Sequence, residues 1–155
     1  MKFVLILCLA VATVLGAAPG AAAFKLAPPS VGFSGSGAIT ITTPSGGAYK
    51  CKLALHGATN AIGVGRITSA HFIPGPAACA NTAASGLPWK AVAVTAATAK
   101  ILNMGVITPF GNCGLATVPV AISGGGVWTI NHPLPPACLN VSASFATAPP
   151  IKIVP

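Results

Sequence analysis

Residues 50–56 read Lys-Cys-Lys-Leu-Ala-Leu-His and show the period of two that marks a β-strand with one buried face. Cys51, Leu53 and Leu55 fall on the apolar side of this stretch, and the two lysines and the histidine fall on the opposite side. A similar alternation returns in residues 38–42 and 139–145, and turns rich in glycine and proline separate such stretches. The chain therefore predicts a series of short strands.

About eight to ten strands with no convincing amphipathic helix indicate an all-β fold. We expect a single antiparallel β-sandwich over residues 24–155, with a small β-barrel as the alternative. Strands at residues 33–43 and 151–154 are expected to lie at sheet edges, where they could pair with a neighbouring chain. The aromatic residues expected in the core are Phe33, Phe72, Trp89, Phe110, Trp128 and Phe145.

The first residues have the pattern of a secretory signal peptide. Met1-Lys2 gives a positive start, residues 3–15 are apolar, and three alanines at 21–23 provide a cleavage site. The apolar run is about 13 residues, shorter than the roughly 20 that a membrane helix needs. We therefore expect residues 1–23 to be removed, Cys8 with them, and no transmembrane anchor to remain.

Four cysteines follow this leader, and their spacings of 28, 34 and 25 residues are too wide for a zinc motif. In an exported chain they are expected to form two disulfides, for which three pairings exist. The two strands that open with cysteine resemble one another, which favours Cys51 with Cys138 and Cys79 with Cys113.

The sequence contains eight lysine and arginine residues and no aspartate or glutamate. Without carboxylates there is no acid/base pair, no third member of a Ser-His-Asp triad and no oxygen cage for calcium or magnesium. His56, His71 and His132 lie at no metal-ligand spacing. We therefore expect no enzyme activity, no catalytic residue, no cofactor and no metal site.

The net charge of +8 is scattered along the chain, and only Lys50 and Lys52 lie close together. Nucleic-acid binding domains instead gather their basic residues in a stripe or along one helix. The charge therefore indicates a solvated basic surface and no nucleic-acid partner.

Several motifs resemble those of the secreted proteobacterial family called alkane oxidation protein activators. They are the signal peptide, Cys51 at the start of a strand, Gly86-Leu87-Pro88-Trp89, Asn112-Cys113-Gly114 and the closing Ile151-Lys152-Ile153-Val154-Pro155. The resemblance implies an exported, non-enzymatic accessory protein that favours growth on hydrocarbons. The complete lack of acidic residues departs from the family pattern.

Two functions are therefore expected to compete. The first is a secreted bacterial accessory or surface protein that promotes contact with hydrophobic material such as alkanes, supported by a mean hydropathy of +0.83. The second is a structural subunit of an extracellular fibre or surface layer that assembles through edge strands. The expected partners are a hydrophobic surface, a cell-envelope component or further copies of the chain, and the expected location is extracellular or at the cell surface, with the periplasm as the alternative.

Overall fold

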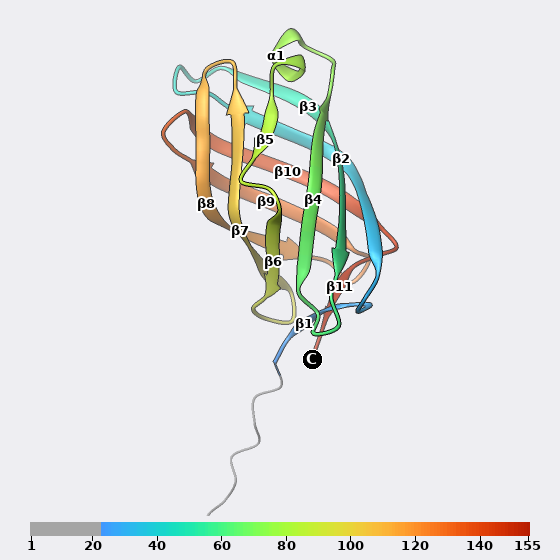
Figure 1. The fold of residues 1–155 in the computed structure, drawn as a ribbon. Helices are drawn as coiled ribbons and strands as arrows, with labels where there is room; N and C mark the ends of the chain where they lie inside the picture. Colours follow the sequence, from blue (N-terminus) through green and yellow to red (C-terminus); the bar gives the residue numbers. More distant parts are fainter. Residues whose placement is uncertain (1–22) are drawn as a thin grey trace, which may run out of the picture.

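The computed structural model describes residues 23–155, and β-strands are their main secondary structure (Figure 1). Within this range, the only helix, α1 (Ala77–Ala80), is four residues long. The strands in chain order are β1 (Lys25–Ala27), β2 (Gly32–Thr42), β3 (Ala48–Thr59), β4 (Gly65–Ile73), β5 (Ala83–Ser85), β6 (Trp89–Ala93), β7 (Thr98–Thr108), β8 (Gly111–Ile122), β9 (Val127–Leu134), β10 (Cys138–Ala148) and β11 (Lys152–Val154).

Eight of these strands form a closed antiparallel barrel. The order around the barrel is β2, β3, β4, β6, β7, β8, β9 and β10, and β10 pairs with β2 to close the ring. Apart from the segment holding α1 and β5, each strand pairs with its successor in the chain, so the fold is an up-and-down barrel. The short strand β5 pairs with β7 beyond the end of β6.

The all-β prediction is confirmed, but the sandwich was wrong and the barrel alternative is correct. Alternating strands look the same in both folds, because each buries one face. The difference lies in the pairing of β2 with β10, in which Ser34 lies opposite Ala148 and Thr42 opposite Asn140. This pairing also corrects the expectation that residues 33–43 form an edge strand, because β3 occupies the other side of β2.

Side chains fill the barrel, as is usual with eight strands. Trp128 on β9 has no exposed surface, and its ring packs against Phe33 and Phe145 at centroid distances of 6.3 and 5.7 Å. The inward positions of residues 50–56 are those that the sequence predicts, with Cys51, Leu53 and Leu55 buried. Phe110 is an exception among the aromatic residues, because it lies in the β7–β8 turn and is 58% exposed.

Different segments cover the two ends of the barrel. At one end, β1 pairs with β11 and places Leu26 in the interior, and Ile151, just before β11, is also completely buried (Figure 1). At the other end lies α1, next to Thr82, whose hydroxyl lies 3.2 Å from the Tyr49 hydroxyl. We call these the β1–β11 end and the α1 end.

Two disulfides are present, Cys51–Cys79 and Cys113–Cys138. The disulfide prediction is confirmed for all four cysteines, but the predicted pairing was wrong. The first bond joins β3 to α1, and the second joins β8 to the start of β10, next to a β-bridge between Cys113 and Pro136. Each bond thus links two successive cysteines and spans one intervening strand, β4 for the first bond and β9 for the second. Residues 1–22 of the predicted signal peptide lie outside the described residues.

Candidate binding surfaces

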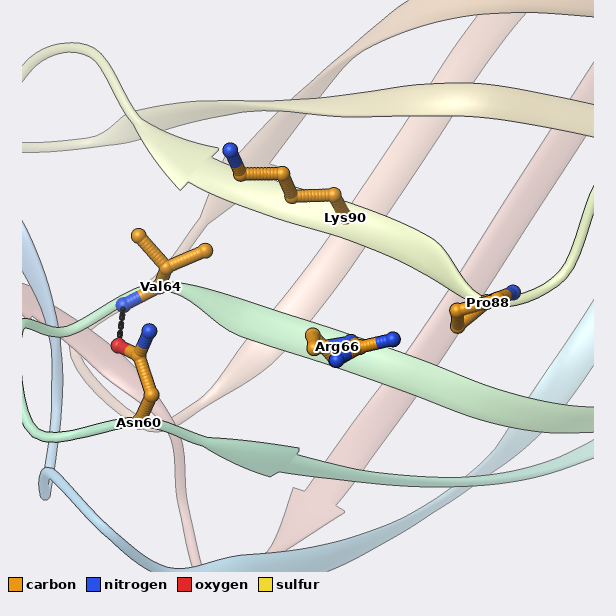
Figure 2. Close-up of a pocket in the computed structure, with 5 residues that line it drawn as sticks. All are labelled: Asn60, Val64, Arg66, Pro88 and Lys90. Carbon is orange, nitrogen blue, oxygen red and sulfur yellow. Dashed lines mark hydrogen bonds between the residues drawn. The ribbon is translucent and has the colours of Figure 1, made fainter.

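Two hollows lie on the outer wall of the barrel. The first, which we call the basic hollow, has a volume of about 380 Å³ and is lined by Asn60, Val64, Arg66, Pro88 and Lys90 (Figure 2). The strands β4 and β6 supply its charged side chains, and the β3–β4 turn supplies Asn60 and Val64. It therefore lies toward the β1–β11 end.

Arg66 and Lys90 face each other directly in the pairing of β4 with β6, and both are exposed. Like charges in this position repel each other and destabilise the pair of strands. The sequence has no aspartate or glutamate that could neutralise them. The basic hollow thus carries two cations without a side-chain counterion, although these residues are 24 positions apart in the sequence.

The Asn60 side chain is fixed by the turn that it begins. Its Oδ1 accepts a hydrogen bond from the backbone N–H of Val64 at 2.8 Å (Figure 2). The remaining polar group of this amide is Nδ2, which is a donor. Together with the arginine and lysine heads, it gives the basic hollow three side chains that can donate hydrogen bonds to a ligand.

The second hollow, which we call the apolar hollow, has a volume of about 310 Å³ and lies at the α1 end. Ala38 on β2, Lys52 on β3 and Ile73 on β4 form one cross-strand row along its floor. Its other lining residues are Lys50, Cys51, Pro74, Gly75 and Pro76.

The Cys51–Cys79 disulfide positions the wall of the apolar hollow. Cys51 lines this hollow, and Cys79 lies in α1, three residues after Pro76. The bond therefore holds the segment with Pro74 and Pro76 close to β3. Ile73 stays 43% exposed beside it, so the hollow presents aliphatic and proline surface to solvent.

Neither hollow was predicted from the sequence. Lys50 and Lys52 were expected on the outward face of their strand, and the structure confirms that both are exposed. Arg66 and Lys90 were expected only as scattered charges. The position of an exposed Ile73 before two prolines is the one sequence signal that could have indicated the apolar hollow.

His56, His71 and His132 lie on β3, β4 and β9. Within residues 23–155, no group of three or more histidine or cysteine side chains is arranged to hold a metal ion. In the same range, no helix is long and apolar enough to cross a membrane.

Residues 1–155 match the family model described as "Alkane oxidation protein activator PraA/PraB-like". A search of curated proteins found no match. A search of solved structures also found none.

Proposed function

The chain belongs to the alkane oxidation protein activator PraA/PraB-like family, and on this premise we propose that it is an exported, non-enzymatic accessory protein that contacts hydrophobic material such as alkanes. The contact site in this proposal is the apolar hollow. The family description supports a role in activating alkane oxidation, and the absence of side-chain carboxylates supports a role other than catalysis.

The observation that carries the proposal is the exposure of Ile73 next to Pro74 and Pro76, on a wall that a disulfide holds in place. Exposed aliphatic surface of this kind gains free energy when it leaves water, by about 25 cal/mol per Å². The stems of Lys50 and Lys52 add further CH₂ groups, while their charged heads can stay in water. A wall that is already rigid loses little conformational entropy when it contacts a ligand.

Export is part of the same proposal. The signal peptide predicted at residues 1–23 and the two disulfides support it, because disulfides persist in oxidising compartments. Cell fractionation followed by N-terminal sequencing tests this point. We expect the protein outside the cytoplasm with Phe24 as its first residue, and an unprocessed cytoplasmic protein would contradict export.

The fibre alternative depends on free edges at residues 33–43 and 151–154. The first edge does not exist, because β2 is paired on both sides within the barrel. The second belongs to β11, which pairs with β1 in a sheet of two strands. At three residues, β11 offers little backbone for pairing with another chain, so we keep one proposed function.

The experiment compares two matched variants, Ile73→Ser and Ile62→Ser. Ile62 is even more exposed, at 73%, but lies in the β3–β4 turn at the opposite end of the barrel. Purified wild-type protein is expected to stay on hexadecane droplets, I73S to remain largely in the aqueous phase, and I62S to behave like the wild type.

The same variants are then expressed in a deletion strain grown on an alkane and on a soluble carbon source. We expect the wild type and I62S to restore growth on the alkane and I73S to restore it poorly, with equal growth on the soluble source. If folded I73S performs as well as I62S in both assays, the apolar hollow is not the contact site. If deletion impairs growth equally on both carbon sources, the proposed function itself is wrong.

A further inference from the structure

We propose that the basic hollow binds the phosphate group of a phosphorylated ligand. This activity is separate from the hydrocarbon contact proposed above, because the two hollows share no lining residue and lie toward opposite ends of the barrel. The proposal rests on charge, on hydrogen-bonding capacity and on the surroundings of the site.

Arg66 and Lys90 lie directly opposite each other on β4 and β6. Their mutual repulsion opposes the strand pairing that brings them together. No aspartate or glutamate exists anywhere in the sequence to offset it. An anion bound between the two side chains would replace this repulsion with two attractive contacts.

Neighbouring lysines strengthen the positive potential of the site. Lys100 lies on β7 diagonally across from Lys90, since its strand partner Val92 is two residues beyond Lys90. Lys25 packs its Cβ against Gly63 in the β3–β4 turn that forms one side of the hollow. Such a concentration of one sign of charge attracts anions over several ångströms.

The side chains that line the basic hollow are rich in hydrogen-bond donors. Asn60 Oδ1 accepts the Val64 N–H, and the other polar groups of these side chains are all donors: Asn60 Nδ2, the Lys90 ammonium and the Arg66 guanidinium (Figure 2). Val64 and Pro88 complete the wall with apolar surface. A ligand group that only accepts hydrogen bonds fits this arrangement.

Two features favour a phosphate over a carboxylate. A phosphate monoester carries a charge of about −1.5 to −2 at pH 7, which balances both cations, whereas a carboxylate balances one. It also offers three free oxygens to the three donor side chains. The ligand group is therefore a phosphate monoester, carried either by a soluble molecule or by a lipid headgroup.

The first test titrates ¹⁵N-labelled protein with inorganic phosphate at constant ionic strength and follows the amide resonances by NMR. We expect saturable shifts centred on Val64, Arg66 and Lys90. Arg66→Gln and Lys90→Gln should each weaken binding about tenfold or more, the effect of losing one hydrogen bond to a charged group. Lys152→Gln, which removes the same charge from β11 and lines neither hollow, should leave the affinity within about twofold, since exposed charges interact weakly over distance.

The second test identifies the source of the phosphate. The same proteins are sedimented with phosphatidylcholine vesicles that contain or lack phosphatidic acid. If the wild type sediments with vesicles that contain phosphatidic acid and R66Q does not, the site is supported and its phosphate belongs to a lipid headgroup. If free phosphate binds saturably but the protein does not sediment with the vesicles, the site is supported and its phosphate belongs to a soluble molecule. The proposal is overturned if neither form binds, if K152Q weakens binding as much as R66Q, or if acetate shifts the same resonances at the same concentrations.

Discussion

Trp128 on β9 donates its indole N–H to the backbone carbonyl of Ile151 at 3.1 Å. The N–H of Ile151 in turn donates to the Thr147 hydroxyl at 2.7 Å. Trp128 and Ile151 have no exposed surface. This pair of hydrogen bonds attaches the segment that leads into β11 to the inside of the barrel, so closure of the β1–β11 end depends on it.

Replacing Trp128 with phenylalanine should destabilise the protein by about 2–4 kcal/mol. The substitution leaves the buried carbonyl of Ile151 without its donor and opens space beside Phe33 and Phe145. Urea unfolding measures the change, with Val127→Ala as the control, because Val127 is the exposed neighbour on the same strand. The control should fall within about 0.5 kcal/mol of the wild type. Equal effects of the two substitutions would contradict the role assigned to the indole.

The disulfide pairing gives a clear expectation for trypsin digestion without reduction. Trypsin cleaves after lysine and arginine, which leaves Cys51 in the dipeptide 51–52 and Cys79 in the peptide 67–90. Cys113 and Cys138 both lie in the peptide 101–152. With the bonds Cys51–Cys79 and Cys113–Cys138, the dipeptide is crosslinked to 67–90 and 101–152 carries an internal bond. Either other pairing would crosslink 101–152 to both of the other peptides.

Removing either disulfide by replacing both of its cysteines with serine should cost roughly 3–4 kcal/mol, because the unfolded chain gains conformational freedom. The two bonds close separate loops of 28 and 25 residues, so their costs should add in the quadruple variant. Urea unfolding of the three variants checks this. A strongly non-additive result would show that the two crosslinks act on the same part of the fold.

The structural features that were predicted correctly from the sequence are those that depend on neighbouring residues in the chain. Residues 50–56 place Cys51, Leu53 and Leu55 inside because alternation on one strand is a local property. Closure of the barrel is not local, since the other barrel strands lie between β2 and β10 in the chain. Phe110 was misplaced for a related reason: its apolar character indicates burial, but its place in a turn exposes it.

The basic hollow could not be predicted for the same reason, because its residues are distant in the sequence. Arg66 and Lys90 become partners only through the register of β4 with β6, and α1 and β5 lie between these strands in the chain. No tight turn joins the two strands to set that register. The disulfide pairing failed in the same way, because likeness between two cysteine strands says nothing about which segments the fold brings together.

Gly37 offers a test of barrel closure. It lies opposite Phe145 where β2 pairs with β10, and a Cβ at this position would overlap the carbonyl oxygen of Ser144. Gly37→Ala should therefore push the two strands apart and cost about 3 kcal/mol. Gly124→Ala is the matched control, because a Cβ there meets no atom within 4 Å, and it should change stability by less than about 0.5 kcal/mol. If thermal or urea unfolding shows similar stability for both variants, the close approach of β2 and β10 is not required.

Acid should have little effect on the stability of this fold. Acid unfolding of most proteins comes from carboxylates whose pKa is lower in the folded than in the unfolded state, so that stability is lost as the pH falls and they take up protons. The sequence contains no aspartate or glutamate, whose side-chain carboxyl groups titrate between about pH 2 and pH 5 in other proteins. We expect the melting temperature, followed by circular dichroism at constant ionic strength, to change by less than about 4 °C across this window, which corresponds to about 1 kcal/mol for a chain of this size.

Repeating the melts at low and high salt provides the control, because the cations that lack counterions, such as Arg66 and Lys90, should make stability depend on salt and not on pH. A fall of tens of degrees between pH 5 and pH 2 would contradict the expectation.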